Sequence, residues 1–343
     1  MARNKPTMQD IADALRISKN SVYLALNDKP GVSDTLKKHI LETAESMGYG
    51  GFSAGTKSRC IMVLTPEYLR NDAFFYSEVF WAVEREAKKR GYLSISTSIS
   101  PVSEKELTLP TLPEGVEVVG FLIIGILDRT YVKRLTKMQI PTICVDIPYP
   151  GIPMTCISSS NHSGGYAAAK HLIDQGHKKI GFIGPVYTAQ SVYERWCGFR
   201  QAMEQAGLPL DDTYNITGKP GQFELFDTAE ILEPLFSKIS NYPTAWFCAG
   251  DRIAITVMNL LTARGIRVPE DISIMGFDDI PLAQIVMPQL TTMHVDRSRM
   301  GRLAVEYLLQ TAERKRAPMD VCLPCFLVER GTVAPPAENT KNS

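Results

Sequence analysis

The chain has 343 residues, of which 44% are hydrophobic and 22% charged, as expected for a globular protein of two or three structural units with a sizeable core. Its 37 basic and 37 acidic residues give a formal net charge of zero, so no overall basic field points to a nucleic-acid partner. No stretch approaches the roughly 18 apolar residues of a membrane span, and no apolar signal segment opens the chain, so we expect a cytoplasmic protein without a membrane partner.

The seven cysteines are scattered, and most lie in apolar runs such as "ICVDI" and "WFCAG". Their odd number and irregular spacing do not fit a disulfide framework. Cys322 and Cys325 form one C-x-x-C pair, but zinc needs four ligands, and neither a second pair nor a histidine cluster accompanies them. We therefore expect no metal site and no cofactor.

Residues 1–49 form the first predicted domain, which consists of three short helices and no strand. Thr7 is a good N-cap with Asp10 as its capping-box partner, and it precedes apolar residues at helical spacing. Ser18 starts a second helix, and Ser33 starts a longer third helix. Two short helices joined by a tight turn are the arrangement in which the second helix enters the major groove of DNA.

The second predicted helix has a polar face that suits DNA. With Val22 at its buried centre and 100° per residue, Asn20, Tyr23 and Leu24 lie on the far side of the helix. Asn20 suits a bidentate contact with adenine, whereas Leu24 offers only apolar contact, for which a thymine methyl group is the natural partner. A solvated face on a small helical cap is the alternative interpretation.

From Ile61 onward, short apolar runs alternate with helical stretches, for example "CIMVL" before 75–90 and "KKIGFIG" before 193–206. This alternation predicts parallel sheets covered by helices on both faces, and its length of more than 250 residues predicts two such lobes. Ligands of open sheets bind beyond the carboxyl ends of the strands. We expect the glycine-rich residues 50–60 to form a flexible linker and the polar residues 333–343 a flexible tail.

The segment "MQDIADALRISKNSVYLALNDKPGVSDTLKKHILETAESMGY" resembles the DNA-binding head of the LacI/GalR repressor family, and "GGYAAAKHLIDQGHKKIGFIG", "RGIRVPEDISIMGFDDIPLA" and "PQLTTMHVDRSRMGRLAVEYLL" resemble later blocks of the same family in order. The resemblance implies an α/β protein with a three-helix helix-turn-helix head and a two-lobed, periplasmic-binding-protein-like core. It implies DNA contacts by Ser18, Lys19, Asn20, Ser21, Tyr23, Leu24 and Asn27. It divides the core, 61–332, into a first lobe of about 61–157 and 291–321 and a second of about 158–290 and 322–332.

The resemblance also implies a small-molecule effector, carbohydrate-like, between the lobes. Position by position, it implies effector contacts by Phe75, Tyr76, Asp146, Arg195, Phe223, Asp251 and Asp278. Arg195 is suited to bidentate hydrogen bonds with hydroxyls or a carboxylate. Each residue has a structural alternative: the aromatics as core, Asp146 as a turn cap, Asp251 as an N-cap, and Arg195 with Asp278 as a surface ion pair.

Three departures from the family pattern qualify these implications. The reading helix carries Tyr23 and Leu24 where the family has a Ser-Arg pair, which removes a guanine contact of about 1–3 kcal/mol in discrimination. The linker is shorter by about six residues and lacks the leucine that wedges into the minor groove, so the resemblance leaves open whether this linker kinks the operator by intercalation. Gly250 stands where an asparagine often contacts the ligand, which leaves the identity of the effector open.

Together these features predict a transcriptional regulator, a repressor, that binds a double-stranded DNA operator as a homodimer, because one reading helix makes too few contacts alone. The alternative is a cytosolic small-molecule sensor whose head binds DNA weakly or nonspecifically, as the short linker and Leu24 suggest. An exported solute-binding protein does not fit the missing signal segment. The sequence has no HExxH motif, nucleophile elbow or dinucleotide fingerprint, so we expect no enzyme.

Overall fold

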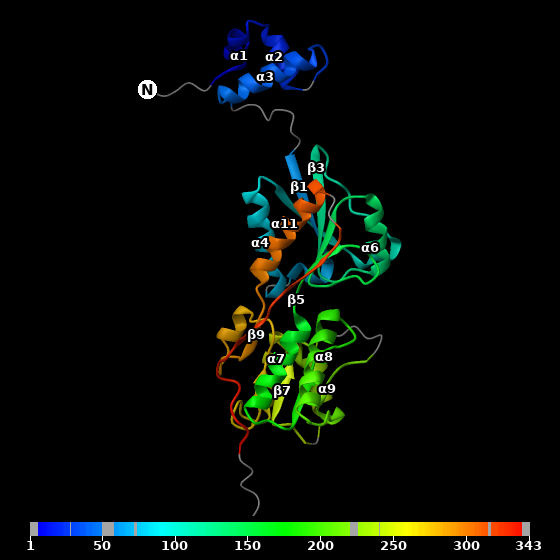
Figure 1. Ribbon diagram of the computed structural model, residues 1–343, viewed down its shortest axis with the longest axis vertical. Helices are drawn as coiled ribbons and strands as arrows, with labels where there is room; N and C mark the ends of the chain where they lie inside the picture. Colours follow the sequence, from blue (N-terminus) through cyan, green and yellow to red (C-terminus); the bar gives the residue numbers. More distant parts are fainter. Residues whose placement is uncertain are drawn as a thin grey trace, which may run out of the picture. The chain divides into compact units, whose positions relative to one another are not determined.

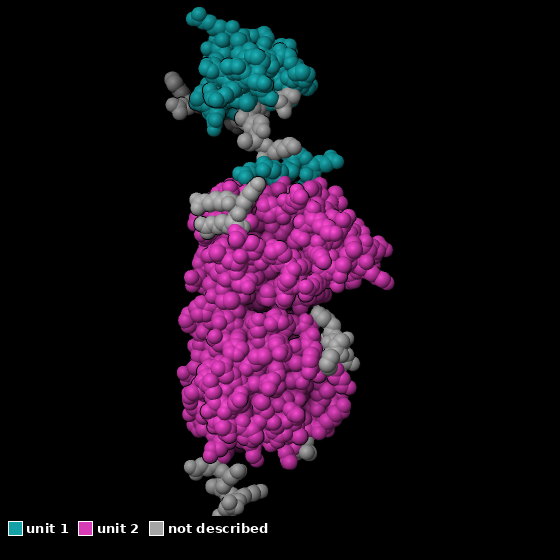
Figure 2. Space-filling view, turned by 45° about the vertical axis from the view of Figure 1, so that its right-hand side comes forward, with its two compact units in different colours: residues 1–59, 113–117 teal, residues 60–112, 118–343 magenta. Residues whose placement is uncertain are grey.

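The structure is a computed structural model in which the chain forms two compact units (Figure 2). The first unit comprises residues 1–59 with 113–117, and the second comprises 60–112 with 118–343. The residues that the structure describes are 6–27, 29–49, 58–71, 74–219, 226–239, 241–314 and 317–337.

The first unit contains the three predicted helices, α1 (Met8–Leu15), α2 (Lys19–Leu26) and α3 (Asp34–Ser46). Their N-caps are confirmed: Thr7 and Asp10 form a complete capping box, and the Ser18 and Ser33 side chains accept hydrogen bonds from the first turns of α2 and α3. A small core holds the helices together, and its buried members are Ile11, Ala12, Val22, Ala25, Ile40 and Ala44.

The first lobe of the second unit is built on a six-stranded sheet of order β10-β5-β4-β3-β1-β2 (Figure 1). The pairs β1–β2, β3–β4, β4–β5 and β5–β10 are parallel, as predicted from the strand-helix alternation. The strands are β1 (Ser58–Pro66), β2 (Leu93–Ile99), β3 (Val116–Ile124), β4 (Thr142–Val145), β5 (Thr155–Ser159) and β10 (Asp320–Leu323). The helices of this lobe are η1 (Glu67–Asn71), α4 (Phe75–Lys89), α5 (Pro101–Glu106), α6 (Arg129–Leu135), η2 (Thr136–Met138) and α11 (Arg297–Arg314).

The second lobe has a parallel sheet of order β6-β7-β8, whose strands are buried along their whole length. Its strands are β6 (Ile180–Ile183), β7 (Ala245–Cys248) and β8 (Ser273–Met275). Its helices are α7 (Asn161–Asp174), α8 (Gln190–Gln205), η3 (Asp212–Tyr214), α9 (Ala229–Phe236), α10 (Asp251–Ala263) and η4 (Pro281–Gln284). Large aromatic side chains fill the core of this lobe, among them Phe182, Phe199, Phe236, Trp246 and Phe247.

The chain passes between the lobes three times: after β5, after β9 (Thr292–His294), and between β10 and β11 (Phe326–Val328) (Figure 1). β9 and β11 pair antiparallel, so two of these passes lie side by side. The elements end two to four residues later than the predicted lobe boundaries, because β5 runs to Ser159, β9 to His294 and β10 to Leu323.

The two terminal boundaries of the core also differ from the prediction. β1 begins at Ser58, so the last three residues of the predicted linker belong to a strand, while residues 50–57 lie outside the described residues. Residues 333–337 do not behave as a free tail: the Ala334 N–H donates to Ser273 Oγ at 3.1 Å, and its carbonyl oxygen lies 2.9 Å from His177 Nε2. No helix among the described residues is long and apolar enough to cross a membrane.

Candidate functional site

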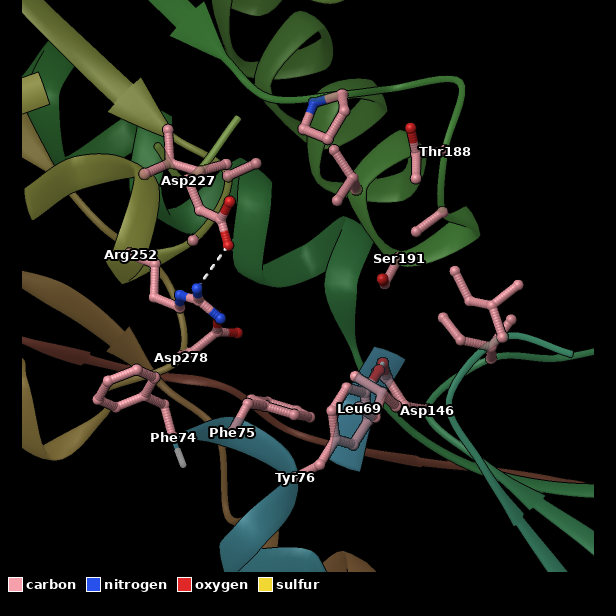
Figure 3. A pocket seen from close by; sticks show the side chains of 18 of the residues that line it. Leu69, Phe74, Phe75, Tyr76, Asp146, Thr188, Ser191, Asp227, Arg252 and Asp278 are labelled. Atoms are coloured by element: carbon pink, nitrogen blue, oxygen red, sulfur yellow. Dashed lines mark hydrogen bonds and ion pairs between the residues drawn. The ribbon is translucent and has the colours of Figure 1, made fainter. Parts of the chain in front are cut away.

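A cavity of about 440 Å³ opens between the two lobes of the second unit (Figure 3). Its walls come from segments that follow strands or begin helices, where open parallel sheets hold their ligands. The first lobe contributes residues from η1, the start of α4, and the segments after β3 and β4. The second lobe contributes the starts of α8 and α10 and the segment after β8.

The cavity brings together five of the seven residues that were predicted to contact an effector, namely Phe75, Tyr76, Asp146, Arg195 and Asp278. They come from both lobes and from positions more than 200 residues apart in the sequence. Phe223 lies outside the described residues. Asp251 is the one described residue of the set that does not line the cavity.

Asp251 neither lines the cavity nor caps α10. Asp251 is the first residue of α10, and the N-cap position belongs to Gly250. Its carboxylate is fully buried and accepts hydrogen bonds from Thr292 Oγ1 at 2.5 Å and from the Ile280 N–H at 2.9 Å. At this position the side chain turns away from the cavity toward the loop that follows β8, so it fixes that loop.

Arg195 reaches the cavity floor because two glycines let α8 pack closely on α7. A Cβ atom at Gly165 would collide with the Arg195 backbone, and one at Gly198 would collide with the His162 carbonyl oxygen. The buried guanidinium donates from Nε to Asn161 Oδ1 at 2.9 Å and from Nη1 to the Ala249 carbonyl at 2.5 Å. The central carbon atom of the Arg195 guanidinium lies 3.8 Å from the centre of the Phe277 ring.

The third nitrogen of the Arg195 guanidinium, Nη2, forms an ion pair with Asp278 Oδ1 at 3.1 Å. Arg195 and Asp278 therefore do pair, but in the cavity wall and not on the surface, since their side chains are only 6% and 16% exposed. These contacts engage three of the five N–H donors of the Arg195 guanidinium and leave one N–H on each of Nη1 and Nη2.

Asp146 and Asp278 both sit in the left-handed region, with φ of 75° and 109°, where a non-glycine residue is strained. Each directly follows a buried stretch that begins as a strand. Burial raises the pKa of both carboxyl groups, that of Asp278 to about 6, although the nearby charge of Arg195 lowers both. Asp146 is not a simple turn cap, since it is 5% exposed and its carboxylate faces the cavity wall.

The two aromatic residues predicted at the start of α4 line the cavity and also pack against the core. Phe75 and Tyr76 are half-buried, with their ring centres 4.9 Å apart in an edge-to-face arrangement. The Tyr76 hydroxyl donates to Asp146 Oδ2 at 2.8 Å. Tyr76 therefore links the aromatic wall to one of the two buried carboxylates.

An ion pair at the cavity wall was not predicted from the sequence. Arg252 Nη2 lies 2.8 Å from Asp227 Oδ2, and the Arg252 guanidinium carbon lies 5.3 Å from the ring centre of Phe74, a residue of the first lobe (Figure 3). The hydroxyl residues Thr188 and Ser191 also line the cavity. A polar residue directly after the predicted Asp251 was the available signal for Arg252, but nothing in the sequence places Asp227 opposite it.

In the first unit, α2 presents the face that was predicted to read DNA. Lys19, Asn20 and Tyr23 are exposed, and the buried side is formed by Val22 and Ala25. Two details differ from a simple polar face. Lys29 Nζ lies 3.2 Å from the Tyr23 hydroxyl, and it also lies 5.0 Å from the centre of the same ring.

Leu24 and Ser21 are less available than their spacing suggested. Leu24 is half-buried, and a Cβ atom at Gly31 would lie only 3.0 Å from its Cδ1, so it packs against the turn after α2. The Ser21 hydroxyl lies 2.8 Å from the Ser18 hydroxyl. Asn27 lies just beyond the end of α2, where its side-chain amide donates to the Tyr23 carbonyl at 2.8 Å. Lys19 and Asn20 are exposed polar side chains of this face at the start of α2.

The fold and the cavity define the class first: a small helical head of helix-turn-helix type and a two-lobed core with a cavity between its lobes. Comparison with known proteins agrees. Residues 169–333 match the periplasmic binding protein-like domain family. The chain is 30% identical over 314 residues to the HTH-type transcriptional repressor PurR of Aliivibrio salmonicida, covering 90% of this chain and 93% of that protein.

Two solved structures show the same fold at full length. The lac repressor dimer bound to operator and the anti-inducer ONPF matches with a TM-score of 0.71 and 22% identity, covering 96% of this chain and all of that chain. The transcriptional regulator CelR in its cellobiose complex matches with a TM-score of 0.69 and 21% identity, over 96% of this chain and all of that one.

The chain belongs to the LacI family of transcriptional regulators. It is a DNA-binding transcriptional repressor with a periplasmic-binding-protein-like effector domain, which confirms the predicted fold class and general function. Membership in this family of regulators also confirms that the chain is not an enzyme.

Proposed function

We propose that this repressor binds a pseudo-palindromic operator as a homodimer and is controlled by a carbohydrate-like effector in the cavity between its lobes. The observation that carries the proposal is the convergence of Phe75, Tyr76, Asp146, Arg195 and Asp278 on one cavity from two lobes. A ligand held by both lobes binds differently to different lobe arrangements, which is what an effector needs in order to shift a population of states.

The composition of the cavity supports a carbohydrate-like ligand. Aromatic rings suit the apolar faces of sugar rings, and buried carboxylates suit their hydroxyl groups. The cavity volume of about 440 Å³ falls in the usual range for small-molecule sites. The fold relative CelR is described in complex with cellobiose, which is consistent with a sugar in this fold.

The head supports operator reading through a narrow set of side chains. Asn20 and Lys19 are exposed on α2, so we assign base contact to Asn20 and phosphate contact to Lys19. Tyr23 and Leu24 would add apolar contact at the edge of the groove. Ser18 is the N-cap of this helix, Ser21 lies in its first turn and Asn27 is its C-cap, and we assign to them contacts with DNA phosphates.

A homodimer is supported by large apolar side chains left exposed on the second unit. Trp81 on α4 is 64% exposed, and Ile285 and Met287 beyond η4 are 70% and 85% exposed. Exposed apolar groups of this size are typical of protein contact surfaces. The fold relative lac repressor is described as a dimer on its operator.

The proposal is tested by selecting fragments of the host genome on the full-length chain and sequencing those retained. We expect enrichment of an inverted repeat whose half-sites lie about one helical turn of DNA or a multiple apart. In the Asn20→Ala variant, specific binding should fall more than nonspecific binding, whereas Glu42→Ala, on the exposed side of α3, should change neither. Retention of fragments without any shared site would contradict the proposal.

A second candidate is a small-molecule sensor whose head binds DNA weakly or nonspecifically. The observation that favours it is the local engagement of the reading face, because Tyr23 contacts Lys29 and Leu24 packs against Gly31. In that case, retention depends steeply on salt concentration but not on sequence. The same selection experiment separates the two candidates.

A further inference from the structure

Arg16 holds an unfavourable backbone conformation in the turn between α1 and α2. Its φ of 53° and ψ of 44° lie in the left-handed region, which glycine and asparagine enter at little cost and other residues avoid. The turn itself uses only the backbone of this residue, because the Arg16 N–H donates to the carbonyl oxygens of Ala12 and Asp13. Glycine would close the turn equally well, so the arginine side chain calls for an explanation outside the turn.

The side chain of Arg16 is exposed, and among the described residues its guanidinium forms no hydrogen bond or ion pair. Asp13, the acid three positions earlier, instead accepts a hydrogen bond from Gln9 Nε2 at 2.9 Å. Arg16 lies two positions before Ser18, the N-cap of α2. An exposed cation is thus held at a strained position beside the start of the reading helix, where a partner outside the protein can reach it.

A second cation lies beyond the other end of α2. The backbone of Lys29 is fixed by a hydrogen bond from its N–H to the Leu24 carbonyl oxygen at 2.9 Å. Lys29 Nζ lies 3.2 Å from the Tyr23 hydroxyl oxygen and 5.0 Å from the centre of the same ring, so this side chain is held beside Tyr23. An ammonium group has three N–H donors, and the hydroxyl takes one, which leaves two for a further acceptor.

The spacing of the two cations suits a helix in the major groove. α2 comprises eight residues, Lys19–Leu26, and therefore extends about 12 Å. The major groove is about 12 Å wide, with a row of phosphates along each edge. Arg16 precedes α2 by three positions, Lys29 follows it by three, and the sequence of α2 contains no acidic residue. With α2 in the groove, a cation beyond each end of the helix comes close to phosphates.

We infer that Arg16 and Lys29 each bind a DNA phosphate, one beyond each end of α2, and that Tyr23 is the positioning residue for Lys29. The inference rests on the proposed operator binding and adds two contacts that were not predicted from the sequence. Phosphate contacts supply affinity for DNA of any sequence and fix how a reading helix is seated in the groove. The two residues thus add to the positive charge that α2 itself carries only at Lys19.

The competing explanation is that both residues act within the head. Arg16 would then stabilise the turn, and Lys29 would stabilise the C-terminal end of α2 through the helix dipole. This explanation predicts that removing either charge loosens the head, whereas phosphate binding predicts weaker DNA binding by an equally stable head. Measuring stability and DNA binding on the same variants separates the two explanations.

The test uses the full-length chain and a duplex of random sequence, about 40 base pairs long, so it does not depend on the operator. Affinity is measured from about 50 to 200 mM KCl. Arg16→Asn removes the charge and places a residue that tolerates the left-handed backbone. The slope of log affinity against log salt concentration should become shallower by about 0.9 for each bound head, and affinity at about 0.1 M KCl should fall roughly eightfold per head.

Two matched variants accompany Arg16→Asn. Arg16→Lys keeps a charge at the strained position and should retain most of the slope. Lys38→Asn removes the same charge from an exposed position on α3 and should leave the slope nearly unchanged. Hydrogen exchange of the α1–α3 amides, measured in the full chain, follows the stability of the head. We expect exchange in Arg16→Asn to be as slow as in the parent or slower, because backbone strain is relieved.

Lys29→Met should lower the slope by a similar amount, and Tyr23→Phe tests how Lys29 is positioned. Tyr23→Phe keeps the ring and removes the hydroxyl, so it should weaken DNA binding about two- to threefold in the parent. In the Lys29→Met background the same change should have no effect, because the ammonium group that the hydroxyl positions is gone. A loss of the same size in both backgrounds would show that Tyr23 does not act through Lys29, which would overturn that part of the inference.

Three further results would overturn the inference: an unchanged salt slope in Arg16→Asn or in Lys29→Met, an equally large slope change in Lys38→Asn, or faster exchange throughout the head of Arg16→Asn. Absence of binding to the random duplex at the lowest salt concentration would also overturn it. Retention of genome fragments without any shared site, by contrast, contradicts the proposed operator reading and leaves the phosphate contacts standing.

Discussion

The two walls of the cavity differ in what they are made of. The first lobe contributes mainly rings and aliphatic side chains, such as Phe74, Phe75 and Tyr76, with Asp146 as its buried charge. The second lobe contributes both guanidinium groups and two carboxylates, paired with each other. Removing an atom group from an apolar wall has a local effect. Removing one member of a buried charge pair leaves the other charge buried without its partner. We therefore expect the second wall to dominate stability and pH dependence.

The largest effect is expected from Arg195→Met. This change strands the Asn161 amide oxygen, the Ala249 carbonyl and the Asp278 carboxylate, all of which Arg195 now contacts. Breaking a buried charge network costs about 3–5 kcal/mol, measured as the free energy of unfolding in urea. Arg200→Met on the same helix, where the guanidinium lies 5.9 Å from the Trp196 ring, is the control and should cost less than about 1 kcal/mol. Equal losses of unfolding free energy in Arg195→Met and Arg200→Met would show that the charged wall contributes no more to stability than an arginine elsewhere on the same helix.

The second effect is a change in pH dependence in Asp278→Asn. Because the pKa of Asp278 is raised to about 6, the folded state keeps a proton between pH 4 and 6 that the unfolded chain has lost. The parent therefore loses stability as the pH rises through this range, and this contribution amounts to at most about 3 kcal/mol. The variant should lack this loss, so its stability relative to the parent should grow from pH 4 to pH 7. Parallel pH profiles would show that Asp278 is not held in this way.

A smaller effect is expected from the aromatic wall. Tyr76→Phe removes the hydroxyl that donates to Asp146 Oδ2 and leaves the ring in place. The loss of a hydrogen bond to a charged acceptor lowers the unfolding free energy by about 1–3 kcal/mol. The measurement is made at pH 8, because a higher pH favours the ionised form of Asp146. Tyr187→Phe, at a residue that is 55% exposed, is the matched control and should be neutral. A neutral Tyr76→Phe would mean that the two walls are not linked through Asp146.

The smallest effect is expected from Arg252→Gln. The Arg252 side chain is 42% exposed in its ion pair with Asp227, and solvent screens pairs of this kind. Its loss should change the unfolding free energy by no more than about 1 kcal/mol, and roughly 1 M salt should shrink the difference further. If Arg252→Gln loses as much unfolding free energy as Arg195→Met, the difference in exposure does not determine how much each arginine contributes to stability.

The comparison also shows what sequence reasoning could reach. The three caps of the head and the alternation of strands and helices are local patterns, and the structure has them where they were predicted. The family resemblance also placed five residues that the structure brings to one cavity. These features depend on short-range spacing or on matched positions.

What the sequence could not give depends on contacts between distant segments. Arg195 contacts Asn161, Ala249 and Asp278, which lie on three other segments of the chain, so no spacing rule indicates these contacts. The Asp251 carboxylate accepts a hydrogen bond from Thr292, 41 positions away, and does not line the cavity. The pKa of Asp278 likewise depends on burial and on the charges of Arg195, Arg297 and Asp146, which lie on distant segments.

The central claim is that a ligand in this cavity controls DNA binding, and one titration tests it most directly. The selected operator fragment is bound to the full-length chain. A sugar that raises the melting temperature of the protein is then added, and the Asp278→Asn variant is measured in parallel. We expect the sugar to change operator affinity at least about fivefold in the parent and not at all in the variant. Equal operator affinity with and without a saturating sugar in the parent would contradict the account.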